Sequence, residues 1–354
     1  MSRFWEGRRV LVTGHTGFKG SWLVLMLARC GARVHGYALQ PPTKPSLFET
    51  ARVHEHLSGH AIGDVRDARA LADAVEAAAP EVVFHLAAQP LVRASYREPV
   101  ETYATNVMGT VHLLEAARSA GCVRALVNVT SDKCYAEDAS GRPHHEGDAL
   151  GGHDPYASSK ACAELVTSAY RDSFLASQGV LVASARAGNV IGGGDWAQDR
   201  LVPDFFRALD AGEVLEVRRP DAVRPWQHVL DPLSGYLQLA ERLASGDATC
   251  ARPWNFGPAA ADARPVRWLL ERLSSDAGAA AWRRAPGRHP HETATLLLDS
   301  TEARRELGWK PRWPLQEALA RTLAWHRAWR AGADMQRLTL DQIAAHAARE
   351  PVAA

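Results

Sequence analysis

The residue pair with the clearest chemical potential is Tyr156 and Lys160, which stand four positions apart in the segment YASSK. This spacing places both side chains on one face of a helix. A free tyrosine has a pKa of about 10 and is a poor base at neutral pH, but a nearby ammonium group favours the phenolate and lowers that pKa. The pair predicts a base that removes a proton from a substrate hydroxyl, although surface helices without catalytic roles also carry this spacing.

A second reactive segment, Ser131-Asp132-Lys133, directly follows an apolar run at residues 125–130. Ser131 is predicted to hydrogen bond the same substrate hydroxyl as Tyr156. Asp132 and Lys133 supply an additional acid and base, which the oxidation of an alcohol does not need but the elimination of water does. An exposed ion pair at the end of a strand is the alternative interpretation of these two residues.

Three glycines spaced as GxxGxxG (Gly14, Gly17 and Gly20) join a strand-like run at residues 9–13 to a helix-like run at residues 18–30. The first glycine permits a tight turn, the second lets a pyrophosphate approach the backbone, and the third lets helix and strand pack closely. The free amides and the positive dipole end of the helix attract phosphates. The motif in this strand–turn–helix context predicts dinucleotide binding, whereas a glycine-rich turn alone would be weak evidence.

The choice between NAD and NADP stays open at this level. NAD sites usually carry an acid at the end of the second strand, but here that strand ends in GYALQ at residues 36–40. Lys19 and Lys44 are candidates for binding a 2′-phosphate. Asp64, after the third strand, is predicted to contact the adenine, with a surface turn as the alternative.

The elements that position these motifs alternate between strand-like and helix-like segments. Short apolar runs rich in Val or Leu occur at residues 9–13, 33–38, 81–86, 125–130 and 180–185. Helix-like stretches between them occupy residues 18–30, 67–79, 100–120 and 155–177. Runs of this kind suit a parallel sheet that is buried on both faces. The alternation predicts an α/β protein with a Rossmann-type doubly wound parallel sheet.

The alternation covers residues 1–186, which are predicted to form the NAD-binding Rossmann domain. Beyond them prolines, tryptophans and arginines become frequent, and residues 187–354 are predicted to form a smaller, interleaved C-terminal substrate-binding domain. A helix-like stretch at residues 229–243 favours a returning segment near 225–245 that packs on the first domain. Residues beyond about 332 suit a peripheral helix or a frayed end.

Composition excludes several classes of function. The formal net charge of the 354 residues is +1 and no long basic run occurs, which argues against nucleic-acid and membrane partners. The five cysteines are scattered without a CxxC motif, which argues against a disulfide framework or a zinc site. The HxH pairs at 54/56 and 289/291 lack a further ligand at suitable spacing, so no metal site is expected. No apolar N-terminal segment occurs, which predicts a cytoplasmic enzyme.

Taken together, the chain closely resembles the CDP-glucose 4,6-dehydratases of the extended short-chain dehydrogenase/reductase superfamily, from about residue 5 to residue 329. The stretches that carry the resemblance are GHTGFKG (14–20), LAAQP (86–90), SDKCY (131–135), AGNVIGGGDW (187–196), RPWQHV (224–229), WNFG (254–257) and LGW (307–309). The related dTDP-glucose dehydratases carry Asp-Glu at the position of Asp132-Lys133, and simple sugar epimerases lack that acid–base pair.

The resemblance implies NAD as the cofactor, CDP-glucose as the substrate and a reaction in three stages. Tyr156, with Ser131 and Lys160, removes the C4 hydroxyl proton while the C4 hydride moves to NAD. Asp132 protonates the C6 hydroxyl as water leaves across C5 and C6, and the hydride then returns to C6. Lys133 is either the C5 base, for which it must be neutral, or a residue that orients the substrate or a water.

The predicted ligand contacts combine the motifs with this resemblance. The predicted cofactor contacts are Gly14, Thr16, Gly17, Phe18, Lys19, Gly20, Asp64, Ala87, Ala88, Tyr156 and Lys160. The predicted substrate contacts are Gln89, Asn189, Arg224 and His228, with Arg218, Trp226 and Arg288 as weaker candidates. Arg224 suits a bidentate phosphate contact, with a structural salt bridge as the alternative.

The resemblance also implies a homodimer, or a tetramer, through a four-helix interface made by residues 100–120 and 155–177. The Ala-rich faces of these helices equally suit burial within one chain. Two other functions stay open: an NDP-sugar 4-epimerase or reductase, against which Asp132 and Lys133 argue, and a non-catalytic dinucleotide sensor, which would not need the tyrosine, lysine and serine together. No motif specifies the nucleotide base, so another NDP-sugar 4,6-dehydratase is a further alternative.

Overall fold

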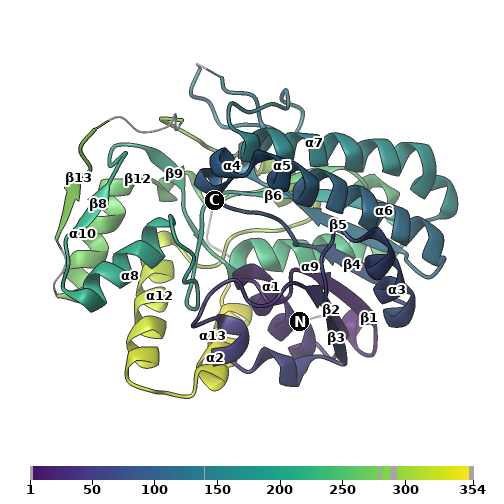
Figure 1. The fold of residues 1–354 in the computed structure, drawn as a ribbon, viewed down its shortest axis with the longest axis horizontal. Helices are drawn as coiled ribbons and strands as arrows, with labels where there is room; N and C mark the ends of the chain where they lie inside the picture. The colour runs from purple at the N-terminus through teal and green to yellow at the C-terminus, as the bar shows by residue number, and fades with distance from the viewer. Residues whose placement is uncertain (1–2, 139, 279–280, 288–292, 351–354) are drawn as a thin grey trace.

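A parallel sheet forms the centre of the computed structural model, which describes residues 3–138, 140–278, 281–287 and 293–350 (Figure 1). The sheet has seven strands in the order β11-β6-β5-β4-β1-β2-β3. The strands are β1 (Arg9–Thr13), β2 (Arg33–Ala38), β3 (Gly59–Ile62), β4 (Val82–His85), β5 (Ala125–Val129), β6 (Leu181–Ala187) and β11 (Pro253–Phe256). All neighbouring pairs in it are parallel. The predicted α/β Rossmann-type sheet is confirmed.

Helices cover both faces of the sheet, which is why its strands are nearly continuous apolar runs. On one face, α1 (Phe18–Arg29) and α9 (Leu230–Ala244) share a core with the strands. On the other face, α3 (Ala68–Ala78) and α6 (Gly109–Ala120) share a second core with them. The order of strands reverses between β1 and β4, and ligands of such sheets bind at the carboxyl ends of the strands beside this point.

The two long helical predictions, 100–120 and 155–177, each correspond to a helix with a π-helical turn. The first consists of α5 (Pro99–Tyr103), a π turn and α6. The second consists of α7 (Pro155–Tyr170), a π turn and a short 3-10 turn. Pro155 takes the first helical position, where its missing amide needs no partner, and the carboxylate of Asp154 caps the helix by accepting from the amide of Ala157 at 2.8 Å.

The C-terminal half returns to the sheet more extensively than the sequence indicates. α9 packs on β5 and β6, and β11 then adds a seventh strand parallel to β6. This strand has the sequence PWNF, and Trp254 and Phe256 in it are fully buried. Four residues are too short for a periodicity that distinguishes a strand from a loop. Finally, α13 (Met335–Ala348) packs against α1 and α12 (Leu315–Arg330).

The remaining elements form a smaller layer with a core of its own. Its larger helices are α8 (Leu201–Ala211), α10 (Val266–Ala277) and α12. Its strand pairs are β7 (Val190–Ile191) with β10 (Gln227–His228), β8 (Leu215–Val217) with β13 (Trp282–Arg284), and β9 (Val223–Pro225) with β12 (Ala263–Pro265). Short helices are α2 (Leu47–Thr50), α4 (Val92–Arg97) and α11 (Thr301–Glu306). None of the helices within the described ranges has the length and apolar character to cross a bilayer.

Candidate active site

A cavity of about 1510 Å³ opens at the carboxyl ends of β1, β4, β5 and β6 and continues along α8 and β9. Small-molecule sites usually occupy about 300–1,000 Å³, so this cavity has room for a dinucleotide and a second ligand. The predicted site residues that line it are Gly14, Thr16, Gly17, Phe18, Lys19, Gly20, Asp64, Ala87, Ala88, Ser131, Asp132, Lys133, Tyr156, Lys160, Asn189 and Arg224, with the weaker candidates Arg218 and Trp226.

The glycine loop has the geometry that its spacing predicts. Gly14 has a φ of +75°, and a Cβ atom there would lie 2.7 Å from the backbone nitrogen of Ala87. A Cβ atom on Gly17 would contact only the carbonyl oxygen of Gly14, at 3.3 Å, so its other side is open. Helix α1 begins directly after Gly17 without a side-chain cap, which leaves its first amides available for a phosphate.

Asp64 lies at the edge of the cavity and also forms a local turn. Its carboxylate accepts hydrogen bonds from the backbone amide and the Nε of Arg66, both at 2.9 Å. The hydrogen bond from the Arg66 side chain holds the pKa of Asp64 below its ordinary value. Both the predicted cofactor contact and the alternative surface turn therefore fit its position.

Helix α7 brings Tyr156 and Lys160 into the cavity, and both side chains are buried. Burial raises the pKa of Tyr156 to about 12, whereas a hydrogen bond with Ser131 and the charge of Arg200 act in the opposite direction. Burial also lowers the pKa of Lys160 to about 8. The protein's own residues therefore do not give the acidic phenol that the lysine spacing predicted, because the burial of Tyr156 outweighs its favourable neighbours.

Strand β5 delivers Ser131, Asp132 and Lys133 to the same cavity through a 3-10 turn, Asp132–Cys134. The hydroxyl of Ser131 accepts from the amide of Lys133 at 3.2 Å and donates to Oδ1 of Asp132 at 3.1 Å. The Asp132 side chain is only 2% exposed, and its Oδ2 has no hydrogen-bond partner among the described residues. Asp132 is thus a buried carboxyl group with one free oxygen, which corrects the alternative of an exposed ion pair.

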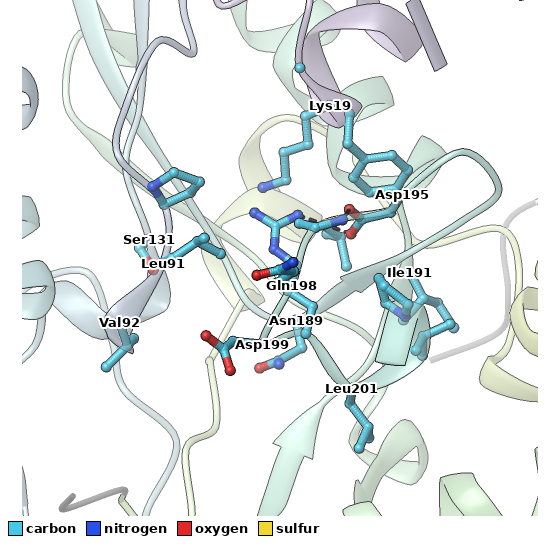
Figure 2. A pocket seen from close by; sticks show the side chains of 18 of the residues that line it. Lys19, Leu91, Val92, Ser131, Asn189, Ile191, Asp195, Gln198, Asp199 and Leu201 are labelled. Atoms are coloured by element: carbon cyan, nitrogen blue, oxygen red, sulfur yellow. Dashed lines mark hydrogen bonds and ion pairs between the residues drawn. The ribbon is translucent and has the colours of Figure 1, made fainter. Parts of the chain in front are cut away.

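Two cationic side chains, Lys19 and Arg200, line the cavity near these groups, and only Lys19 was predicted from the sequence. Lys19 extends from α1 into the cavity, with Asp195, Gln198 and Asn189 on the wall that faces it (Figure 2). Burial lowers the pKa of Lys19 to about 7, and the positive charge of Arg200 adds to this shift. Arg200 precedes α8 and is held by Asp195 at 2.9 Å. Its place six residues after a run of three glycines was the only sequence signal.

The predicted substrate contacts divide into two groups. Asn189 lines the cavity, and its Oδ1 has no hydrogen-bond partner in the described part of the chain. Arg224 also lines the cavity, and its Nη1 donates to the carbonyls of Val223 at 2.9 Å and Ala294 at 3.4 Å. Arg288, like His289 and His291, lies outside the described residues.

Gln89 and His228 do not reach the cavity, which corrects the prediction for both. The Gln89 amide is occupied by Leu91 and by the hydroxyl of Thr102, at 2.6–3.1 Å, so it holds a turn together. His228 is fully buried between the rings of Trp22 and Trp313, and burial lowers its pKa well below the ordinary value. Both residues were predicted from the family resemblance, but a hydrogen-bonded turn holds the Gln89 side chain and an aromatic core holds that of His228.

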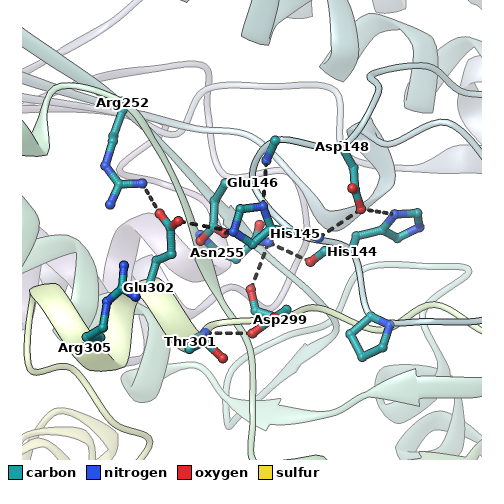
Figure 3. A network of polar contacts seen from close by, with 12 residues as sticks. His144, His145, Glu146, Asp148, Arg252, Asn255, Asp299, Thr301, Glu302 and Arg305 are labelled. Carbon is teal, nitrogen blue, oxygen red and sulfur yellow. Dashed lines mark hydrogen bonds and ion pairs between the residues drawn. The ribbon is translucent and has the colours of Figure 1, made fainter.

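His145, Glu146 and Glu302 have the composition of a metal site, but the hydrogen bonds of the histidine do not suit a metal ligand. Nε2 of His145 lies 3.2 Å from Glu302 and 3.7 Å from Glu146 (Figure 3). However, Nδ1 of His145 accepts a hydrogen bond from the amide of Gly147 at 3.1 Å. In a neutral imidazole the proton then resides on Nε2, between the two carboxylates, where a metal would need a lone pair.

Comparison with known proteins assigns the family. A family model described as GDP-mannose 4,6 dehydratase matches residues 11–322. The chain belongs to this family. Among curated relatives, the CDP-glucose 4,6-dehydratase of Salmonella typhimurium is 52% identical over 338 residues, which cover 94% of each chain. The dTDP-glucose 4,6-dehydratase of Streptomyces griseus is 32% identical over 90% of this chain and 95% of that relative.

Solved structures of the extended short-chain dehydrogenase/reductase type have the same fold. A dTDP-glucose 4,6-dehydratase from Streptomyces venezuelae with NAD and DAU bound superposes with a TM-score of 0.79 at 28% identity, covering 93% of this chain and 99% of that chain. The UDP-glucose 4-epimerase of Thermus thermophilus complexed with NAD has a TM-score of 0.78 at 27% identity, covering 90% and 99%. Because one fold serves dehydratases and epimerases, the reaction must be argued from the site.

Proposed function

We propose that the protein is an NAD-dependent dehydratase that converts CDP-D-glucose to CDP-4-dehydro-6-deoxy-D-glucose and water. The observation that carries the reaction type is the buried carboxyl group of Asp132, which shares one cavity with Ser131, Tyr156 and Lys160. An epimerase needs no such group. The 52% identity to the Salmonella CDP-glucose 4,6-dehydratase supports cytosine as the base.

The glycine loop and α7 would hold the cofactor. The open side of Gly17 and the first amides of α1 suit the pyrophosphate, and Gly14 keeps the loop close to Ala87. Asp64 lies where the adenine end would reach the second and third strands. NAD bound there supplies a hydride acceptor for C4 and a hydride donor for C6, so no external oxidant is consumed.

Tyr156 and Ser131 act on the C4 hydroxyl. The Tyr156 oxygen takes the hydroxyl proton as C4 becomes a ketone, and Ser131 orients that hydroxyl. Lys160 is one turn along the same face of α7, and its ammonium favours the phenolate once a second cation, the nicotinamide ring, is also present. Burial works against ionisation of Tyr156. We therefore expect Tyr156 to become an effective base only when NAD is bound.

Asp132, next to Ser131, acts on the neighbouring part of the sugar, at C6. The ketone at C4 acidifies the C5 proton, which a base removes while Asp132 gives its proton to the C6 hydroxyl, so that the C6–oxygen bond breaks and water leaves. Lys133 lies 3.4 Å from Oδ1 of Asp132 and is 31% exposed. We assign it either the removal of the C5 proton or the orientation of the water that removes it.

Arg200, Arg224 and Asn189 would bind the diphosphate and the sugar. Arg200 and Lys19 both line the cavity, close enough for their charges to interact. Together they form a cationic centre suited to a dianionic diphosphate. Asn189 offers a free carbonyl oxygen to a sugar hydroxyl. The distribution of these groups explains how a chain of net charge +1 can present a positive site.

We also propose a homodimer formed by α5, α6 and α7. Large apolar side chains remain exposed on this helical surface: Val100, Tyr103, Met108, Leu165 and Phe174. Such a concentration on adjacent helices is unusual for a surface that faces only water. A cytoplasmic location is part of the proposal, since the five cysteines are all unpaired.

The direct test is to incubate the purified protein and NAD with CDP-, UDP-, dTDP- and GDP-glucose and to follow product mass and carbonyl formation. The expected result is the loss of one water from CDP-glucose, with much lower rates for the other three sugars. An isomer of unchanged mass would instead indicate an epimerase. The absence of any product from all four sugars would overturn the assignment.

A further inference from the structure

Tyr135 directly follows the 3-10 turn Asp132–Cys134 (the catalytic turn) and lines the cavity beside it. The Tyr135 hydroxyl lies 2.7 Å from Oδ1 of Asn255 and 2.9 Å from Nη1 of Arg186. Its ring stacks on His144 with centroids 4.6 Å apart and planes 2° from parallel. The turn that carries Asp132 is therefore fixed at its far end by a buried side chain.

The direction of each hydrogen bond at Tyr135 follows from Asn255. The amide Nδ2 of Asn255 donates to the carbonyl of His144 at 2.9 Å and to that of Asp299 at 3.1 Å (Figure 3). Its Oδ1 is thus the acceptor that faces Tyr135. The Tyr135 hydroxyl must donate to Asn255 and accept from Arg186, so removal of the hydroxyl would break both links.

Arg186 also reaches the catalytic helix. Its Nη2 donates to Oε2 of Glu164 at 2.7 Å, and both side chains are only 2% exposed. Glu164 stands on α7, one helical turn after Lys160, and accepts further hydrogen bonds from Ser184 at 2.6 Å and from Thr130. A single guanidinium therefore connects the helix of Tyr156 with the turn of Asp132.

A buried ion pair of this kind is a poor source of stability, because desolvating the two charges costs about as much as their attraction returns. Its distinctive property is fixed geometry, since a planar guanidinium makes directed hydrogen bonds to two partners at once. We infer that Arg186 and Tyr135 are positioning residues that set the distance between Asp132 and the hydroxyl-oxidising pair. This inference rests on the proposed dehydratase function.

The test uses Tyr135→Phe, which retains the stacked ring but removes the link between Arg186 and the catalytic turn. C4 oxidation should stay within about threefold of wild type, because α7 keeps its contact with Arg186 through Glu164. Elimination should slow about 10- to 100-fold, the usual effect of a small displacement of a reacting group. Stopped-flow absorbance of the reduced nicotinamide should show a transient that the wild type does not accumulate, and rapid-quench mass analysis should identify the 4-keto sugar that still retains its oxygen at C6.

The matched control is Thr167→Val, which removes another buried hydrogen bond of α7, the 2.7 Å contact with Asn128, away from the cavity. It should lower the melting temperature without changing the ratio of the two steps. Arg186→Lys should reproduce the Tyr135→Phe defect if it folds, and the double variant should add nothing further. If Tyr135→Phe slows both steps equally, or neither, while wild type still forms the dehydrated sugar, the inference is wrong. If wild type forms none, the proposed function fails instead.

Discussion

The ammonium of Lys133 lies 3.4 Å from Oδ1 of Asp132, and the same oxygen accepts a hydrogen bond from the hydroxyl of Ser131. Among the described residues, all side-chain donors to this carboxylate therefore contact Oδ1 and none contacts Oδ2. The second oxygen, Oδ2, lies 3.2 Å from where a Cβ atom on Gly188 would be. A residue with a side chain at position 188 would crowd that oxygen. The asymmetry leaves one oxygen of Asp132 without a donor among the described residues, which suits its proposed role as an acid.

Asp132→Asn should separate oxidation from dehydration. The variant cannot donate a carboxylic proton, so elimination should slow by about 10²–10⁴-fold while C4 oxidation continues. Reduced nicotinamide and a 4-keto sugar should accumulate in a single turnover, observed by absorbance and mass. Tyr156→Phe provides the contrast, because it should block the first step and accumulate no reduced cofactor. Dehydration at the wild-type rate in Asp132→Asn would show that the acid lies elsewhere.

Lys160→Met should stabilise the free protein while abolishing its activity. Burial lowers the pKa of Lys160 from 10.5 to about 8, so the folded state carries an unfavourable charge at every pH below 8. Removing the charge should raise the free energy of unfolding at pH 7 by about 1–3 kcal/mol. The gain should shrink as pH rises from 8 to 10.5, because the unfolded chain then binds the proton and the folded chain does not.

The measurement for Lys160→Met is urea unfolding at several pH values without ligands. Lys310→Met, at an exposed position, should show no such pH-dependent gain. A loss of stability in Lys160→Met at pH 7 would mean that the hydrogen bond from Lys160 to the carbonyl of Val129, at 3.4 Å, outweighs the burial of the charge.

Two glycine substitutions should have opposite effects on folding and on binding. Gly14→Ala should destabilise the protein, by about 1–2 kcal/mol from the left-handed backbone alone and further from the clash with Ala87. Gly17→Val should fold, because a Cβ atom there meets only one carbonyl oxygen, yet it should weaken NAD binding at least about tenfold by occupying the pyrophosphate position. Calorimetry on the folded Gly17→Val protein decides the point, and an unchanged affinity for NAD would contradict it.

Arg200→Gln should weaken CDP-glucose binding about 10- to 100-fold, since hydrogen bonds to a charged phosphate typically contribute about 1.5–3 kcal/mol. The dissociation constant, measured with NAD present and a catalytically inactive Tyr156→Phe background, isolates binding from chemistry. Arg267→Gln removes an exposed arginine of the smaller layer that pairs with Asp221, and it should leave the constant unchanged. Equal constants for the Arg200 variant and wild type would exclude a phosphate contact.

Leu165→Glu should dissociate the proposed homodimer, because Leu165 is 59% exposed on α7 and a charge buried there would lack a partner. Sedimentation velocity over a range of concentrations should show a monomer with an unchanged circular dichroism spectrum. Val214→Glu, at an exposed apolar position in the smaller layer, is the control and should remain dimeric. A monomeric wild-type protein would refute the interface directly.

Local patterns in the sequence predicted five of the first six strands (β1, β2, β4, β5 and β6), the glycine loop and the YxxxK helix. Apolar runs of five or six residues identify buried strands, and GxxGxxG encodes a backbone conformation at a fixed place between strand and helix. The position of Ser131 and Asp132 at the cavity was likewise predictable, since carboxyl ends of parallel strands converge on one edge of the sheet.

Which polar residues face the cavity, and how far burial shifts their pKa values, depends on contacts between distant parts of the chain. Gln89 and His228 stand beside true lining residues in the sequence, but a hydrogen-bonded turn and an aromatic core hold them elsewhere. Arg200 enters the site from a loop of the smaller layer that lies 181 residues after Lys19. The high pKa of Tyr156 and the low pKa of Lys160 depend on desolvation, which is a property of the whole packed fold and has no local sequence pattern.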